Sequence, residues 1–505
     1  MKKNSVFSAV LLGLEPKLVE VETDLHASLP SMMIVGLPDK AVEEAKERVR
    51  SAIRASGLPF PRGRVIVNLA PADLKKHGAY YDLPMALSVL AAQGQVPSDL
   101  SRKLFVGELG LDGQVRPVNG VLSLTKLAHK LGWEIFVPWA NAAEARLIRG
   151  AVVRPVRDLA QLVRYLNGDG ELDLVEPIVA SLLRDDDRSE TDLSQIWGQE
   201  TAKRALQIAA AGGHNLVLLG PPGGGKSLLA KAMATILPPL EPEEAISVTE
   251  IYSLAGLVDS SRPMTTARPF RAPHHSATAW AMIGGGQPLR PGEISLAHGG
   301  VLHLDEITEF NRQVLESLRE PLEEGYITLT RVAGRYSFPA KFSLVATMNP
   351  CPCGFFRSHK ACICLPGQVT RYWQKISGPL LDRMDLFCWV GAADLSVHPF
   401  DSNAGQIKTS QTVRAQVIAS LERQKSRQGH GVLNSQLSHE QIKSFCSLDS
   451  AGKALMRKAA EKLSLSLRAY VRVLKVARTI ADLSDSPNIK PPHLGEALQY
   501  RLNID

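Results

Sequence analysis

Two short strings in the chain carry the residue types that bind and hydrolyse a nucleoside triphosphate. Residues 220–227 read GPPGGGKS, in which the glycines let backbone N–H groups face a phosphate chain. Lys226 can reach the β- and γ-phosphates, and the Ser227 hydroxyl can bind Mg²⁺. Residues 301–306 read VLHLDE, where Asp305 can hold the same Mg²⁺ and Glu306 can polarise the attacking water. Together they predict an ATP hydrolase with Mg²⁺ as cofactor. The predicted nucleotide contacts are Gly220, Pro221, Pro222, Gly223, Gly224, Gly225, Lys226, Ser227 and Asp305.

These side chains act together only if regular elements bring them to one place. NLVLLG (215–220) is typical of a short buried strand, and LLAKAMATIL (228–237) of a helix, so strand, glycine loop and helix follow in P-loop order. A chance glycine-rich turn is the alternative, which these flanks disfavour. FSLVATMN (342–349) predicts another buried strand, ending on Asn349, whose amide can position the water. The other interpretation of Asn349 is a turn residue before Pro350.

Transfer of a phosphoryl group needs more positive charge than one lysine and Mg²⁺ supply. Ring-forming ATPases obtain it from an arginine of the neighbouring subunit, which contributes roughly 10³–10⁵ in rate. Arg383, in LLDRMDLF (380–387), is our candidate, and a local ion pair with Asp382 or Asp385 is the alternative. Arg468, in the helical segment 466–483, is a second candidate for a γ-phosphate contact. A solvated basic helix face is the alternative for that segment.

Four of the six cysteines lie within residues 351–364, and they form two C-x-C pairs. Thiolates converging from two short turns can satisfy tetrahedral Zn²⁺, although C-x-C is tighter than the usual C-x-x-C spacing. We therefore predict a structural zinc site, with free thiols in a reducing compartment as the alternative. The predicted ligands are Cys351, Cys353, Cys362 and Cys364.

Three basic segments are candidates for contact with DNA. Residues 325–342 alternate with a two-residue period, which predicts a hairpin with Arg331 and Arg335 flanking its tip. Arg357 and Lys360 lie beside Phe355 and Phe356 in the cysteine loop, where charge and stacking surface suit a nucleic-acid strand. A solvated loop tip is the alternative for that segment. The third segment, RPFRAPHH (268–275), ends in two adjacent histidines, for which hydrogen bonds or subunit contact are favoured over metal binding.

The composition fits a folded protein with about three domains. The chain has 505 residues, of which 45% are hydrophobic, and its net charge of +7 with a pI near 9.0 suits a nucleic-acid partner. No apolar run reaches the roughly 18 residues of a membrane helix. The first residues resemble a signal peptide, but Glu15 and Glu20 follow at once. We therefore predict a cytoplasmic protein without a membrane partner.

Composition and periodicity divide the chain into an N-terminal domain (1–168), an acidic linker (169–192), an α/β core (193–395) and a helical domain (396–505). Within the first domain, residues 32–38 and 64–70 read as buried strands, with a helix at 40–56 between them. Residues 400–411 read as a loop, and residues 412–505 as nearly all helix.

Longer strings resemble the magnesium-chelatase-like branch of AAA+ ATPases, and within it the bacterial ComM/YifB family. They are RPFRAPHHSAT (268–278), PGEISLAHGGVLHLDE (291–306) and SGPLLDRMDL (377–386), and the similarity spans essentially the whole chain. The resemblance implies a Lon-protease-like α+β N-terminal domain, a P-loop AAA+ αβα core and a C-terminal helical lid. It also implies a hexameric helicase that promotes branch migration and DNA recombination in natural transformation, acting on single-stranded or branched DNA.

The same resemblance assigns roles to individual residues. Gly220, Lys226 and Ser227 match its Walker A motif, and Asp305 with Glu306 its Walker B motif. Asn349 matches sensor 1, Arg383 the arginine finger and Arg468 sensor 2. The loop departs from the commoner GTGKT form at Gly224 and Ser227, but serine keeps the hydroxyl that Mg²⁺ needs.

The Lon-like resemblance raises a rival activity, peptide cleavage by a serine–lysine dyad. Around the expected nucleophile, residues 75–87 contain no serine, and Leu122 and Leu124 stand where lysines are expected. We therefore expect no proteolysis. Two other rivals remain: a chelatase-type motor that inserts Mg²⁺ into a porphyrin, and a protein remodeller.

Overall fold

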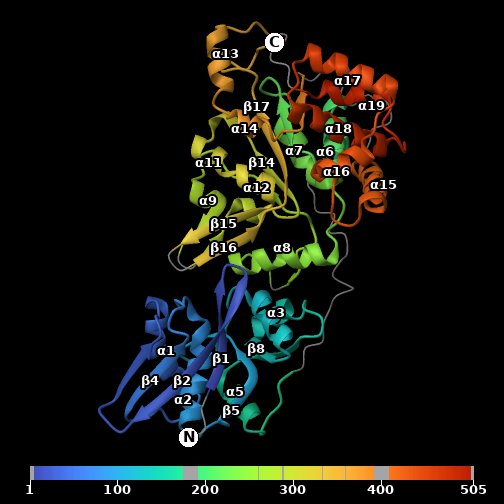
Figure 1. Cartoon of the computed structure of the whole chain (residues 1–505). Helices are drawn as coiled ribbons and strands as arrows, with labels where there is room; N and C mark the ends of the chain where they lie inside the picture. The colour runs from blue at the N-terminus through green and yellow to red at the C-terminus, as the bar shows by residue number, and fades with distance from the viewer. Residues whose placement is uncertain are drawn as a thin grey trace.

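The computed structural model describes residues 5–173, 191–259, 261–286, 289–331, 334–358, 360–391 and 409–501. In Figure 1 an N-terminal α/β part lies below an α/β core, and a group of helices packs beside the core. Most of the predicted acidic linker, and residues 400–408 of the predicted loop, lie outside the described residues. Across the part of the chain that is described, no helix combines the length and apolar character needed to cross a membrane.

The N-terminal part is built on a seven-stranded mixed sheet with the order β3-β4-β2-β1-β5-β8-β9. β1 and β2 form an antiparallel hairpin, and β5, β8 and β9 continue the sheet in parallel. The described elements are β1 (Ser5–Leu12), β2 (Glu15–His26), β3 (Ser31–Val35), α1 (Lys40–Ala55), β4 (Arg64–Ala70), α2 (Asp82–Ala92), β5 (Asp99–Phe105), β6 (Glu108–Leu109), β7 (Val115–Arg116), α3 (Val121–Leu131), β8 (Glu134–Pro138), α4 (Ala142–Ala145), β9 (Val152–Val156) and α5 (Leu159–Leu166).

The helix predicted at 40–56 is α1, which begins where Asp39 caps it by accepting a hydrogen bond from the Val42 amide at 2.9 Å. The strand predicted at 32–38 is present as β3, but the prediction that it is buried is wrong. β3 is shorter and lies at the edge of the sheet, where Met33 is 43% and Val35 is 37% exposed. An apolar run does not reveal whether both faces of a strand will be covered, and here one face is open.

The α/β core contains a five-stranded parallel sheet with the order β11-β14-β17-β10-β18. All four residues of β10 are buried, as expected for a strand covered by helices on both faces. The described elements are α6 (Glu200–Gly212), β10 (Leu216–Leu219), α7 (Lys226–Ile236), α8 (Pro242–Ala255), β11 (Phe270–Arg271), α9 (Ala279–Ile283), β12 (Gly284–Gly285), β13 (Arg290–Pro291), α10 (Glu293–Leu296), β14 (Val301–Leu304), α11 (Arg312–Ser317), α12 (Arg319–Glu324), β15 (Tyr326–Arg331), β16 (Gly334–Pro339), β17 (Ser343–Met348), α13 (Pro366–Trp373), α14 (Gly378–Leu381) and β18 (Leu386–Trp389).

The C-terminal residues are helical, as the periodicity predicts. They form α15 (Ser410–Gln428), α16 (His439–Phe445), α17 (Ser450–Lys462), α18 (Leu467–Leu483) and α19 (Pro491–Gln499). Apolar residues of α15, α17, α18 and α19 share one hydrophobic core with α6, α7 and β10. The helical part is therefore packed directly against the glycine loop's own strand and helix (Figure 1).

The N-terminal part and the core meet where α3 packs on α8 (Figure 1). Glu250 of α8 accepts hydrogen bonds from Ser123, at 2.7 Å, and from Lys126. Buried Glu144 accepts hydrogen bonds from the Leu122 amide, at 3.1 Å, and from the Ser253 hydroxyl near the end of α8. Apolar residues of α8 also join the core of the N-terminal part. The two parts therefore share a packed interface as well as a connecting segment.

Candidate nucleotide hydrolysis site

The glycine loop lies at the carboxyl end of β10, where it opens into α7. Gly220 has no room for a side chain, because a Cβ there would lie 2.1 Å from the Val390 carbonyl oxygen. Lys226 begins α7 and donates hydrogen bonds to the carbonyl oxygens of Gly220, at 2.7 Å, and Pro221, at 2.9 Å. Burial lowers the pKa of Lys226. Its ammonium points back over the loop, where phosphate oxygens would replace the carbonyl partners.

Ser227 and Asp305 meet at the same end of the sheet, although they are far apart in sequence. The Ser227 hydroxyl lies 3.0 and 3.1 Å from the two carboxylate oxygens of Asp305, and Thr347 donates a second hydrogen bond to that carboxylate. Burial raises the pKa of Asp305, but the hydrogen bond from Thr347 and neighbouring positive groups outweigh it, so the pKa is below its ordinary value. A hydroxyl and an ionised carboxylate are hard oxygen ligands, and they fit Mg²⁺ bound with a triphosphate.

Glu306 and Asn349 line one cavity beside Lys226. The Asn349 side-chain oxygen accepts a hydrogen bond from the Lys226 ammonium at 3.1 Å. Glu306 has a left-handed backbone with φ of 52°, and its N–H donates to the Thr347 hydroxyl at 3.0 Å. Glu306 and Asn349 both line this cavity of about 470 Å³, and the basic residues Arg371 and Lys375 line it too. The geometry therefore suits a water molecule held between a base and the γ-phosphate.

Thr347 was not among the residues singled out from the sequence, yet it bridges both acidic residues of the site. It is 1% exposed in an otherwise apolar strand. Its hydroxyl donates to Asp305 and accepts from the Glu306 amide. A single threonine within FSLVATMN is the only sequence signal, and threonine is common enough in strands to make it weak.

Arg383 and Arg468 lie at the opposite edge of the sheet from the glycine loop. The Arg383 carbonyl accepts a hydrogen bond from Asn215, which precedes β10, at 3.0 Å. Its guanidinium forms an ion pair with Glu323, and not with the predicted partners Asp382 or Asp385. Arg468 is 71% exposed and lies 3.8 Å from Asp382. In a single chain, neither arginine reaches the phosphate position.

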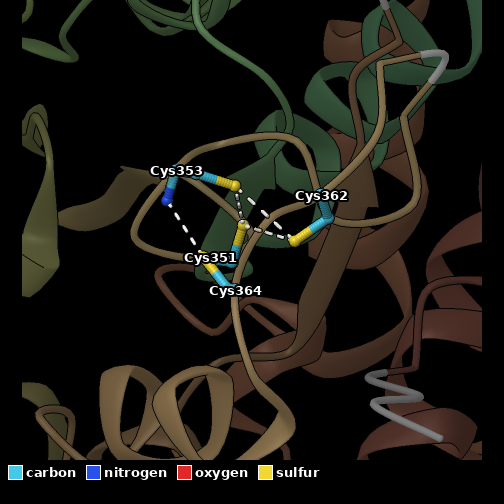
Figure 2. A group of neighbouring side chains, drawn as sticks. All are labelled: Cys351, Cys353, Cys362 and Cys364. Carbon is cyan, nitrogen blue, oxygen red and sulfur yellow. Dashed lines mark hydrogen bonds between the residues drawn. The ribbon is translucent and has the colours of Figure 1, made fainter.

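The four cysteines of residues 351–364 converge, as Figure 2 shows, with all four sulfur atoms within 4.8 Å of one another. The Cys351 sulfur lies 3.3 Å from that of Cys353 and 3.7 Å from that of Cys362. Tetrahedral zinc with bonds of about 2.3 Å would separate its sulfurs by about 3.8 Å, so the group is close to the required size. The donor set therefore fits zinc without a large rearrangement.

The ionisation of the cluster also fits a bound cation. A hydrogen bond from the Phe355 amide lowers the pKa of Cys353 to about 6. For Cys364, the hydrogen bond from the Cys353 amide favours the thiolate, but desolvation and the neighbouring thiols raise its pKa to about 12. One thiolate is thus favoured, whereas four together need positive charge among them.

The predicted hairpin of residues 325–342 is present as β15 and β16, in which Arg331 pairs with Gly334 and Thr330 with Arg335. Arg335 is exposed, whereas Arg331 donates to the Gly286 carbonyl at 3.1 Å. The predicted tip residue at position 333 lies outside the described residues. In the cysteine loop, the cations lie over aromatic rings: Arg357 is 5.6 Å from the Phe356 centroid and Lys360 is 5.2 Å from that of Phe355.

The remaining predicted features have structural partners. Arg271 forms a two-fold ion pair with Glu293, with both N–O distances 2.7 Å. The ring centroids of His274 and His275 lie 4.1 Å apart with the rings tilted by 35°, and His274 shares a hydrogen bond with Ser276. Ser88, the first serine after the expected nucleophile region, is buried in α2 and donates to the Val21 carbonyl at 3.2 Å.

Comparison with known proteins gives matches along nearly the whole chain. The family model described as magnesium chelatase, subunit ChlI, matches residues 192–397, its C-terminal model matches 407–501, and a model described as subunit ChlI of Mg-chelatase matches 21–141. Competence protein ComM of Haemophilus influenzae is 43% identical over 99% of this chain and 97% of its own. The YifB protein of Escherichia coli is 42% identical with the same coverage. The magnesium-chelatase 67 kDa subunit of Chlorobaculum tepidum is 29% identical over 31% of this chain and 23% of its own.

Proposed function

The chain belongs to the ComM/YifB family of magnesium-chelatase-like AAA+ ATPases, and from that premise we propose that it is a ring-forming motor that moves DNA. The ATPase assignment follows from the family, with ATP and Mg²⁺ as its cofactors. The proposal adds that hydrolysis drives strand movement, as in a hexameric helicase that promotes branch migration during natural transformation. The relative named a competence protein supports this direction.

The proposal that the subunits form a ring rests on the separation of the two halves of the hydrolysis site. Lys226, Asp305 and Glu306 lie at the carboxyl edge of a parallel sheet, whereas Arg383 precedes β18 at the other edge. β10 alone spans about 13 Å at roughly 3.3 Å per residue. An arginine finger at that edge can serve only a neighbouring subunit's phosphate, so each subunit needs a second copy.

The observation that supports DNA is the basic hairpin β15–β16, which follows directly on α12. Glu323 of α12 forms the ion pair with Arg383, so the hairpin begins beside the arginine finger. Exposed Arg335 lies near the hairpin end, where it can neutralise a phosphate. A hairpin placed in this way can move when the neighbour's nucleotide changes.

The decisive test measures ATP hydrolysis with and without single-stranded or branched DNA over a salt series. A DNA motor should be stimulated by DNA, and its DNA affinity should fall steeply as salt rises. The Glu306→Gln variant should bind ATP, yet neither hydrolyse it nor unwind a forked duplex. A flat response of the wild-type protein to every DNA would reject the proposal.

A chelatase-type motor is the second candidate, because the matching family models are named after a magnesium chelatase subunit. The Chlorobaculum chelatase subunit covers only a third of this chain, whereas ComM covers nearly all of it. Metal insertion into a porphyrin, measured with and without partner subunits, separates the two functions.

We also propose that the cysteine cluster holds one structural Zn²⁺. Cys351 follows Asn349 after a single proline, and Cys364 precedes α13, which begins at Pro366. A metal bound by both pairs would fix this loop against the hydrolysis site, because α13 carries Arg371 toward the same cavity as Glu306. Closely spaced reduced thiols also support a cytoplasmic location.

A further inference from the structure

Trp280 is an exposed aromatic residue that none of the roles above uses. It lies in α9 and is 64% exposed, more than any other tryptophan of the chain. A single exposed apolar residue is ordinary on a protein surface. The position of Trp280 is informative because of what holds it and what surrounds it.

On one side, the indole of Trp280 packs against the backbone of a glycine, Gly285. A Cβ on Gly285 of β12 would lie 2.2 Å from the indole Cε3, so any larger residue there would displace the ring. The Arg331 guanidinium lies 5.3 Å from the ring centroid, and its Nη2 is 3.1 Å from the same Cβ position. Arg331 is itself held by the Gly286 carbonyl. These contacts gather beside Gly285 and leave the rest of the indole open.

Basic residues from two further segments lie close to the contacts that hold this ring. Arg290 lies on β13 directly opposite Gly285, whose backbone contacts the indole. Lys75, from the N-terminal part, lines the same cleft as Arg331. Both Arg290 and Lys75 are exposed, and no acidic residue occurs among the described residues that line the cleft beside Arg331. An open ring held from one side, with cations nearby, matches a base and its flanking phosphates.

We propose that Trp280 is the stacking residue of a single-stranded DNA site at the junction of the two parts, with Arg290 and Lys75 as its phosphate contacts. The proposal rests on the proposed function, since DNA is its ligand. It goes further in two ways. It gives the N-terminal part a direct contact with the strand, and it makes Arg331 the support of the ring and not a free phosphate contact.

The test compares full-length variants for binding of a fluorescein-labelled oligothymidylate, in the presence of Mg²⁺ and a non-hydrolysable ATP analogue. Loss of stacking in Trp280→Ala should weaken binding by roughly five- to 150-fold, and Trp280→Phe should recover most of the loss. Lys75→Ala should lower the slope of log affinity against log salt by about 0.7, the value for one contact with single-stranded DNA. Basal ATP hydrolysis should not change in these variants.

A matched control is Trp139→Ala, because Trp139 is also exposed and lies under Arg157 at 3.6 Å, but in the N-terminal part. That variant should bind as the wild type does. Unchanged affinity in Trp280→Ala would overturn the stacking site while DNA-stimulated hydrolysis still supported the motor. Loss of assembly in Trp280→Ala, seen by light scattering, would place Trp280 between subunits and also overturn it. Absence of DNA binding by the wild type would refute the motor and this site together.

Discussion

Two variants that are inactive alone should restore ATP hydrolysis when they are mixed, if Arg383 completes the site of a neighbouring subunit. Glu306→Gln removes the base but keeps the arginine. Arg383→Ala removes the arginine but keeps the base, and it should lower the rate by roughly 10³–10⁵. Neither side chain touches the other's site within one chain, because they lie at opposite edges of the sheet. A mixed ring therefore contains interfaces where an intact Glu306 faces an intact Arg383.

The size of the recovery follows from that geometry. When the two variants are mixed equally and at random, half of the subunits keep Glu306 and half keep Arg383. About a quarter of the head-to-tail interfaces therefore combine an intact Glu306 with an intact Arg383, whatever the ring size. The mixture should reach about a quarter of the wild-type rate per subunit, far above either parent. A steady-state phosphate-release assay, after joint assembly with ATP, measures it. Arg457→Ala serves as the control partner, since Arg457 is 84% exposed and pairs only with Glu461 among the described residues. Its mixture with Glu306→Gln should keep about half of the rate, because half of the sites keep their base. No recovery with Arg383→Ala, alongside half activity in the control, would refute a shared site.

Three further outcomes follow from other contacts. Glu323→Gln should leave basal ATP hydrolysis within a few-fold of wild type but lower unwinding of a forked duplex about tenfold or more. Glu320→Gln, at an exposed position of the same helix, should change neither rate. Purified protein should contain about one equivalent of zinc by elemental analysis; Cys351→Ser should lose it, and Cys446→Ala, in a buried cysteine outside the cluster, should keep it. Burial, with nearby positive charge, lowers the pKa of His298 to about 4, so the unfolded chain binds a proton that the folded chain does not as pH falls below 6.5. Wild-type unfolding free energy should therefore drop by about 1.6 kcal/mol more than that of His298→Gln between pH 6.5 and 5, measured by denaturant titration.

The residues of the hydrolysis site could be predicted from the sequence because each of them follows a buried strand of one parallel sheet. The ends of such strands meet at one edge, so Lys226, Asp305 and Asn349 converge without further information. The helical C-terminal part and the β15–β16 hairpin were equally readable from their periods. The failures concern burial and partners. β3 looks like a core strand, but its place at the sheet edge depends on which strands pair, and pairing is not local.

Contacts between side chains of different helices and strands were the hardest features to predict from the sequence. Arg383 pairs with Glu323, sixty residues away in sequence, and not with either neighbouring aspartate. Thr347 joins the two acidic residues of the site through a hydroxyl that no local pattern distinguishes. The junction through Glu250 and Lys126 joins segments that sequence analysis assigned to separate domains. Each of these contacts needs the packed sheet and helices before it can exist.

The position of Glu323 connects two features that would otherwise be independent. α12 ends at Glu324, and β15 begins at Tyr326, so any shift of Glu323 is passed to the hairpin through two residues. Arg383, its ion-pair partner, is only 12% exposed, and its guanidinium also donates to the Pro379 carbonyl. To reach a neighbour's γ-phosphate, Arg383 must therefore exchange these partners for the nucleotide. We infer that nucleotide binding next door competes with Glu323 for Arg383. Hydrolysis would return the arginine to Glu323, and the hairpin with its DNA contacts would be released and recaptured once in each cycle.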